Sequence, residues 1–127
     1  MSKEWTILVA GGRDFDDLVV IEAVMGKAIR HCLTLDPTRK IRFIQGGAKG
    51  ADFLCKCLAK KYGYECDQYD ADWDTHGRGA GNIRNKQMLD EGCPDFVVIM
   101  PGGRGTSDMF HQATQAGLRI FDSRDAK

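Results

Sequence analysis

Short apolar runs alternate along this chain with stretches in which apolar residues recur at helical spacing. Continuous apolar runs rich in β-branched side chains predict buried strands, and spacings of three and four predict amphipathic helices. Strands are predicted at residues 5–10, 41–45, 65–69, 96–100 and 118–121. Helices are predicted at residues 17–33, 51–62, 82–90 and 106–116. Residues 70–81 are polar, contain three glycines and show no period, so we expect a loop there.

This alternation of strands and helices predicts an α/β fold. We expect one Rossmann-like, three-layer domain over residues 1–127, with a mostly parallel five-stranded sheet. The length of 127 residues fits one domain, and the 43% hydrophobic residues suffice for a core. Right-handed crossovers would bring the C-terminal ends of the strands to one edge, where open α/β sheets bind their ligands.

Three glycine-rich turns follow predicted strands and so lie at that edge. The first contains Gly11, Gly12, Arg13 and Asp14. The second contains Gly46, Gly47, Gly50 and Asp52. The third contains Pro101, Gly102, Gly103, Arg104, Gly105 and Thr106. Glycine lets the backbone approach a ligand closely, and N–H groups at a helix start attract anions. The turns therefore predict a phosphate-bearing ligand, a nucleotide or a nucleotide derivative.

Two familiar nucleotide motifs do not fit these turns. The first turn lacks the GxGxxG spacing and the later acidic residue of dinucleotide-binding folds. The second lacks the GKS or GKT of a P-loop, so no hydroxyl is supplied for magnesium. Arg13 either pairs with a phosphate or is a solvated turn residue. Asp52 either favours the start of its helix through the helix dipole or binds a ribose hydroxyl.

Other candidate residues lie before the strand at residues 96–100 and just after the third turn. Trp73 either stacks on a base or packs on the protein, which is the commoner role of tryptophan. Arg84 and Asn85 begin a predicted helix that should point at the crevice, although a solvated arginine is the simpler reading. Asp108 either adds charge near a helix start or acts on a ribose or glycosidic bond. His76 has no partners for a metal site.

Composition limits the classes of partner that we expect for this chain. Lys plus Arg and Asp plus Glu both number 18, so no basic footprint points to nucleic acid or an acidic membrane. The five cysteines form no CxxC pair, so we expect free thiols, no metal and no cofactor. Reduced thiols, no signal peptide and no apolar run long enough to span a bilayer favour a cytoplasmic protein without a membrane partner.

The motifs together resemble the SLOG superfamily of Rossmann-like proteins. The order GGRDF, GGAKGAD, ADW…GRGAGNIRNKQM and PGGRGTSDM is similar to the small YspA-like, YpsA-related members, over residues 5–121. The superfamily includes the Lonely Guy phosphoribohydrolases and the DNA-processing protein DprA. By this resemblance, Arg84 matches the catalytic arginine of those hydrolases. Their catalytic glutamate falls at Met109, with Asp108 one residue earlier, and Asn85 stands where they usually have lysine.

Three functions follow from this resemblance. The first is a module that senses, sequesters or processes a nucleotide-derived small molecule, which the missing glutamate favours. The second is hydrolysis of the N-glycosidic bond of a nucleoside 5′-monophosphate by Arg84 and Asp108. The third is single-stranded DNA binding, against which the zero net charge weighs, so nucleic acid is not the expected partner. A thin domain with exposed helices also suggests a homo-oligomer.

Overall fold

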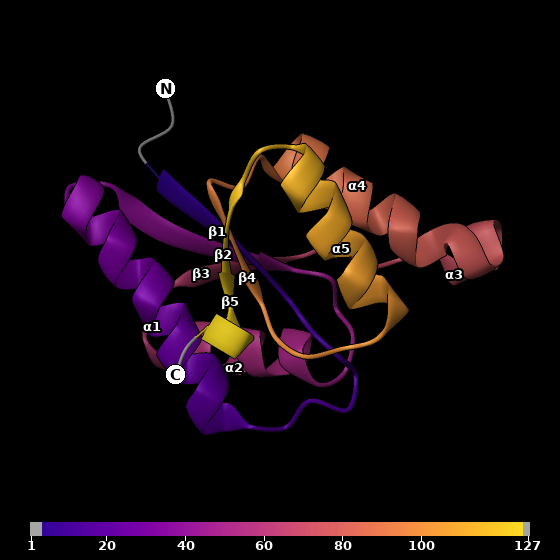
Figure 1. Cartoon of the computed structure of the whole chain (residues 1–127), viewed down its shortest axis with the longest axis horizontal. Helices are drawn as coiled ribbons and strands as arrows, with labels where there is room; N and C mark the ends of the chain where they lie inside the picture. Colours follow the sequence, from indigo (N-terminus) through magenta and orange to yellow (C-terminus); the bar gives the residue numbers. More distant parts are fainter. Residues whose placement is uncertain (1–3, 126–127) are drawn as a thin grey trace.

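The computed structural model describes residues 4–125, which form a sheet covered by helices on both faces (Figure 1). The strands are β1 (Glu4–Ala10), β2 (Lys40–Gln45), β3 (Glu65–Gln68), β4 (Phe96–Ile99) and β5 (Arg119–Asp122). The helices are α1 (Leu18–Leu35), α2 (Ala51–Lys61), α3 (Trp73–His76), α4 (Ala80–Gly92) and α5 (Arg104–Gln115). Two short 3₁₀ helices are η1 (Gly77–Gly79) and η2 (Ser123–Asp125).

The sheet is five-stranded and parallel throughout, in the order β3-β2-β1-β4-β5. The α/β, Rossmann-like three-layer prediction is therefore confirmed, and the sheet is wholly rather than mostly parallel. The chain reverses its direction of winding at β1, since β2 and β4 lie on its two sides. This reversal places the first and third glycine turns side by side at the switch point, where α/β sheets form their ligand crevice.

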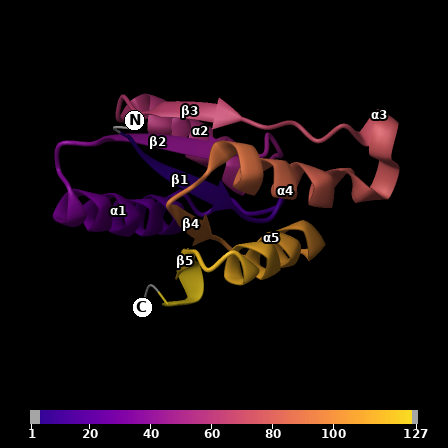
Figure 2. The ribbon, with the colours of Figure 1, turned by 90° about the horizontal axis from the view of Figure 1, so that it is seen from above.

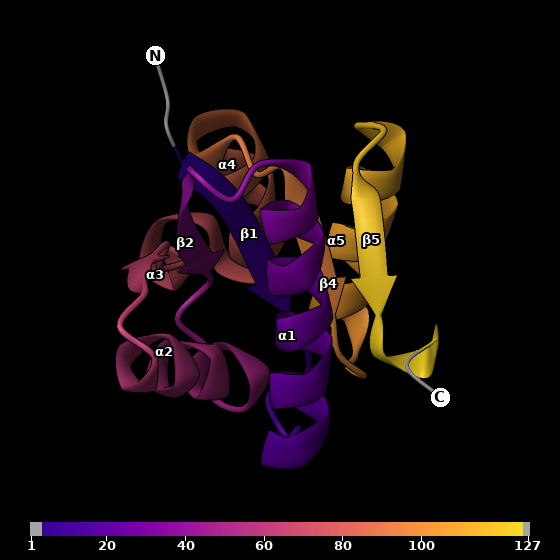
Figure 3. The ribbon, with the colours of Figure 1, turned by 90° about the vertical axis from the view of Figure 1, so that its left-hand side faces the viewer.

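Alternation of side chains along the strands builds two cores, one on each face of the sheet. Figures 2 and 3 show the helices that lie on the two faces. Ile7, Val9 and Phe43 face α1 and α2, whose buried residues include Met25 and Leu58. On the opposite face, Leu8, Ile44 and Val97 pack with Met88 of α4 and Met109 of α5. Burial on both faces explains why β1 and β4 are continuously apolar in sequence, as is typical of parallel strands.

The segment that was predicted to be a loop contains a short helix. Asp72 caps α3 by accepting a hydrogen bond from the Thr75 N–H at 3.1 Å, and η1 leads directly into α4. No side chain of α3 or η1 is buried, which explains why these residues show no apolar period. Figure 2 shows α3 on the side to which the strand β3 points, beyond the C-terminal end of the sheet. Among residues 4–125, no helix is long and apolar enough to cross a membrane.

Candidate phosphate site at the C-terminal edge of the sheet

Backbone hydrogen bonds join the three glycine turns. The Gly12 N–H donates to the Pro101 carbonyl at 2.8 Å, which ties the first turn to the third. The Ala51 N–H donates to the Gly12 carbonyl at 3.2 Å, which ties the second turn to the first. The turns therefore meet at one edge, as the sequence indicated. Some of their N–H groups, however, already donate hydrogen bonds to a neighbouring turn.

Several of the glycines serve this contact between turns. A Cβ atom at Gly11 would lie 2.6 Å from the Cβ atoms of Ala51 and Met100. One at Gly12 would lie 2.9 Å from the Pro101 carbonyl oxygen, and one at Gly102 would lie 2.6 Å from the Gly12 nitrogen. Gly50 also needs its left-handed backbone, with φ of 76°, where its neighbours are the carbonyls of the first turn. Glycine is needed at these positions because neighbouring protein atoms, rather than a ligand, lie against the backbone.

The second turn is filled by its own carboxylate. Asp52, in the first turn of α2, is only 5% exposed and accepts a hydrogen bond from the Ala48 N–H at 3.1 Å. Burial raises the pKa of Asp52 to about 6, against the hydrogen bond from Ala48 and the positive charge of Arg84, which lower it. The Gly47 N–H is also used, since it donates to the Gln45 side chain at 2.6 Å. An anion would find this helix start already occupied.

The third turn differs, because the start of α5 is open. Gly103 precedes the helix without a capping side chain, and no hydrogen bond within residues 4–125 uses the N–H groups of Gly105 and Thr106. Cβ atoms at Gly103 and Gly105 would meet nothing within 4 Å. The Thr106 side chain is 9% exposed, and its hydroxyl likewise makes no hydrogen bond within that range. It lines a hollow of about 440 Å³ together with Ser107 and Phe110.

Arg84 reaches the second turn from α4. Its Nη1 donates to the Gly46 carbonyl, and its Nε donates to Asn85 Oδ1 at 3.1 Å. Burial lowers the pKa of the Arg84 guanidinium below its usual value, while the carboxylates of Asp52 and Asp70 act in the opposite direction. A partly desolvated guanidinium of this kind binds anions more strongly than one in water.

Asn85 links the two residues that were predicted to be catalytic. Asn85 is 3% exposed, and its Oδ1 accepts a hydrogen bond from Arg84 Nε. Its Nδ2 donates hydrogen bonds to Asp108 Oδ2 at 3.0 Å and to the Gly105 carbonyl at 3.1 Å. Gln112 Nε2 donates to the same Asp108 oxygen at 2.7 Å. Arg84 and Asp108 therefore belong to one network that ends at the first turn of α5, with Asn85 between them.

The remaining candidates lie at the surface. Arg13 and Asp14 are exposed in the first turn, and Arg104 is exposed at the start of α5. Trp73 is 57% exposed on α3 and lies against Gly81 of α4, so its ring is neither buried nor stacked in the core. These side chains are exposed on segments at the C-terminal edge of the sheet, and their contact with a ligand stays a prediction.

Comparisons with known proteins agree with these motifs. The model of the YspA, cpYpsA-related SLOG family, abbreviated YAcAr, matches residues 5–76. The chain belongs to the YAcAr family. The match spans β1 to α3 and includes the first two glycine turns and Asp52. The chain is also similar to the gene 61 protein of Mycobacterium phage D29, at 33% identity over 89 residues, which cover 65% of this chain and 70% of that protein.

Membership of the YAcAr family indicates a nucleotide-related function, while the link to Lonely Guy enzymes and DprA stays a prediction. Met109, which the resemblance predicts to match the Lonely Guy glutamate, is wholly buried in the core under α5. A carboxylate at this position would lie among Leu8, Val97 and Met88 rather than at the surface. In this YAcAr protein, Asp108 is the acidic side chain that α5 presents towards Asn85.

Sequence reasoning missed two glutamines of the YAcAr site. Gln45, at the end of β2, is 1% exposed and holds the second turn through Gly47. Gln112 orients Asp108 from the next turn of α5. A polar residue ending an otherwise apolar strand was the available signal for Gln45. The spacing of four residues between Asp108 and Gln112, which places them on one helix face, was the signal for Gln112.

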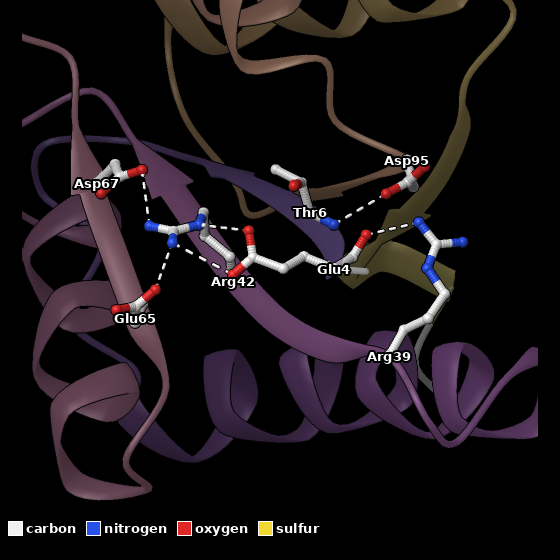
Figure 4. Close-up of polar contacts among 7 residues, drawn as sticks. All are labelled: Glu4, Thr6, Arg39, Arg42, Glu65, Asp67 and Asp95. Carbon is white, nitrogen blue, oxygen red and sulfur yellow. Dashed lines mark hydrogen bonds and ion pairs between the residues drawn. The ribbon is translucent and has the colours of Figure 1, made fainter. Parts of the chain in front are cut away.

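A second polar cluster lies at the opposite end of the sheet (Figure 4). Arg42 of β2 donates from Nε to Glu4 at 3.1 Å and from Nη1 to Asp67 at 3.0 Å, and it also pairs with Glu65. Asp95 accepts from the Thr6 N–H at 2.9 Å. This cluster, called the Arg42 network below, joins β1, β2 and β3 and contains no residue predicted for the site.

Proposed function

We propose that this protein binds a nucleotide or nucleotide-derived ligand and holds its phosphate at the start of α5. The observation that carries the proposal is the open third turn, where the N–H groups of Gly105 and Thr106 and the Thr106 hydroxyl have no hydrogen-bond partner within residues 4–125. The first N–H groups of a helix have no partner within the helix and attract anions. A phosphate oxygen at this helix start would supply the missing acceptor.

Arg84 supports the same ligand from the other side of the edge. Its Nη2 makes no hydrogen bond within the described residues, whereas its Nη1 and Nε hold Gly46 and Asn85. The guanidinium is thus oriented by the protein and keeps a donor for an anion, which is the arrangement that gives charge-assisted hydrogen bonds. Family membership, which indicates a nucleotide-related function, agrees with this chemistry.

Titration calorimetry with AMP, ADP-ribose and inorganic phosphate tests the proposal. Thr106→Val removes one hydroxyl and keeps the shape of the side chain, so AMP affinity should fall about tenfold. Thr114→Val is the matched control, because Thr114 is an exposed threonine on the same helix that bonds to the Phe110 carbonyl. Equal affinities for the two variants, or no binding of any of the three probes by the wild type, would overturn the proposal.

Hydrolysis of a nucleoside monophosphate is the second candidate function. The observation that favours it is the network in which Asn85 joins Arg84 to Asp108, since both charged groups would then flank one ligand. If the reaction occurs, the Asp108 carboxylate stabilises positive charge that develops on the ribose. We expect slow or no release of free base from AMP, because Met109 removes the glutamate of the hydrolases. Rapid release that Asp108→Asn abolishes would establish the enzyme.

A further inference from the structure

A cationic hollow lies on the α1 face of the sheet, between α1 and the edge strand β5. It measures about 470 Å³, and Figure 3 shows the two elements that border it. Lys27 and Arg30 of α1 and Arg119 of β5 line it, and none of the three forms an ion pair within residues 4–125. The whole chain has a net charge of zero, so the hollow is a local excess of positive charge.

The one carboxylate that lines this hollow among the described residues is already paired. Asp122, at the end of β5, accepts hydrogen bonds from Arg124 Nε at 3.0 Å on both of its carboxylate oxygens. Asp122 is therefore not available as a counter-ion for the three cations. Unpaired cations on two elements that flank one hollow attract an anionic partner.

The aromatic rings of the hollow are used within the protein. His31 makes T-shaped contacts with Phe96 and Phe121, with ring centroids 5.1 and 5.6 Å apart. The Arg119 guanidinium carbon lies 4.9 Å from the centre of the Phe121 ring, so the cation takes one face of that ring. Bases of single-stranded nucleic acid bind by stacking on open aromatic faces. The arrangement therefore favours an acidic protein partner over a nucleic acid.

The strand β5 offers backbone groups as well as charge. It is the last strand of the sheet and pairs with β4 alone, so no strand within residues 4–125 covers its outer edge. An extended chain can add to such an edge as a further strand. Residues 24–34 of α1, which border the hollow, span about 15 Å, and four strand residues span about 13 Å. An added strand would therefore run along the whole hollow.

We propose that an extended acidic peptide of a partner protein docks in this hollow by adding to the edge of β5. Successive side chains of a strand point to opposite faces, so every second residue of the peptide would face α1. Arg119 faces α1 too, because it lies two residues from Phe121, which packs in the core on that face. Acidic residues at alternate positions of the peptide would thus meet the three cations. This inference does not depend on the proposed phosphate site.

A second copy of the chain fits this hollow less well. Pairing of β5 with the β5 strand of another copy would bring two identical sets of cations together, which like charges oppose. The other edge strand, β3, carries Glu65 and Asp67, but both are paired with Arg42. Within residues 4–125, neither edge strand is therefore a free acidic strand.

Fluorescence anisotropy with a labelled peptide tests the charge of the partner. The probe is an eight-residue peptide in which glutamate alternates with threonine, and the reference peptide has glutamine in place of glutamate. The reference should bind at least about tenfold more weakly. Lys27→Glu and Arg119→Glu should each lower affinity for the acidic probe about tenfold. Lys60→Glu, the matched control at an exposed position on α2, should change it by less than about twofold.

Hydrogen exchange measured by mass spectrometry tests strand addition. In the peptide-bound protein, β5 should exchange more slowly, whereas the other edge strand, β3, should not change. Circular dichroism checks that each variant is folded, and Lys27→Glu, at an exposed position on α1, tests the charge without altering the strand.

The proposal fails if the acidic probe does not bind, or if it binds without slowing exchange in β5. It also fails if Lys60→Glu weakens binding as much as Arg119→Glu. Protection of β5 by a single-stranded oligonucleotide but not by the peptide, or by dimerisation of the chain alone, would replace the acidic peptide with a different occupant and overturn the proposal.

Discussion

The two ends of the sheet carry hollows of nearly equal size but opposite chemistry. The hollow beside the Arg42 network measures about 460 Å³, and that beside the start of α5 about 440 Å³. In the first, Arg42 is paired with three carboxylates, and Arg39 donates to the Glu4 carbonyl at 2.6 Å. In the second, the Thr106 hydroxyl and the N–H groups of Gly105 and Thr106 have no hydrogen-bond partner within residues 4–125.

The difference shows that pairing, rather than volume, distinguishes a structural cluster from a ligand site. One nitrogen of the Arg42 region, Arg39 Nε, is buried without a hydrogen bond, but its guanidinium stacks 3.7 Å from the centre of the Trp5 ring. The Arg39 cation is therefore already stabilised by a cation–π contact within the protein. At the start of α5, no protein group among the described residues takes the place of a hydrogen-bond acceptor, so an acceptor from a ligand fits there. The following changes test this contrast.

The largest effect is expected from enlarging a glycine that packs against protein. Gly11→Val should lower the free energy of unfolding by about 3 kcal/mol, because its side chain would overlap Ala51 and Met100. Gly103→Val, in open space at the start of α5, should lower it by less than about 1 kcal/mol and should abolish AMP binding instead. Urea unfolding and calorimetry measure the two effects. Equal losses of stability would refute the division of the glycines into packing and ligand positions.

The next largest effect concerns the buried carboxylate of the second turn. The folded pKa of Asp52, about 6, lies above its value in the unfolded chain, so protonation favours the folded state. This stability is fully present below about pH 4 and is lost as the pH rises through about 6. Asp52→Asn keeps an oxygen for the Ala48 N–H. Relative to wild type, it should therefore gain stability by about 2 kcal/mol between about pH 4 and pH 7.

Urea unfolding at several pH values measures this difference. Asp67→Asn is the control, since Asp67 is an exposed carboxylate of the Arg42 network. A pH-independent difference between wild type and Asp52→Asn would show that folding does not raise the pKa of Asp52.

A smaller effect is expected from breaking the Arg42 network. Arg42→Met keeps the aliphatic stem but removes the guanidinium that pairs with Glu4, Glu65 and Asp67, so the free energy of unfolding should fall by about 1 kcal/mol. The loss should shrink in high salt, which screens partly exposed charges. AMP affinity should not change. A marked fall in AMP affinity would show that the two ends of the sheet do not act separately.

The smallest effect is expected from one exposed member of the same network. Glu65→Gln should change the free energy of unfolding by no more than a few tenths of a kcal/mol, because its side chain is 68% exposed. Thermal unfolding beside Arg42→Met gives the ratio of the two effects. A loss as large as that of Arg42→Met would mean that a single ion pair carries the network.

The fold was more predictable from the sequence than the site. Apolar periodicity located all five strands and four helices to within a few residues, because burial on two faces imposes that pattern. It could not locate α3, which buries no side chain and depends on the Asp72 cap. The glycine turns were placed at the correct edge, but their free and used donors could not be told apart. That distinction depends on contacts such as Gly12 with Pro101, which join residues far apart in the chain.

The same limit applies to the individual side chains. The sequence indicated Asp52 as a helix-start charge or a ribose contact, and the structure shows the carboxylate turned inward to the Ala48 N–H. No spacing rule predicted that Asn85 would connect Arg84 to Asp108, since the contact requires α4 to pack on α5.

The strand order also determines when the protein can acquire its site. β1, the first strand made, pairs with β4, and Thr6 bonds to Asp95 across a separation of 89 residues. During synthesis, β1 and β2 can pair early, but the open turn and α5 come only with the last third of the chain. Contacts of such long range close slowly. A ribosome-bound nascent chain that ends before β4 would therefore expose one edge of β1 and lack the proposed phosphate site.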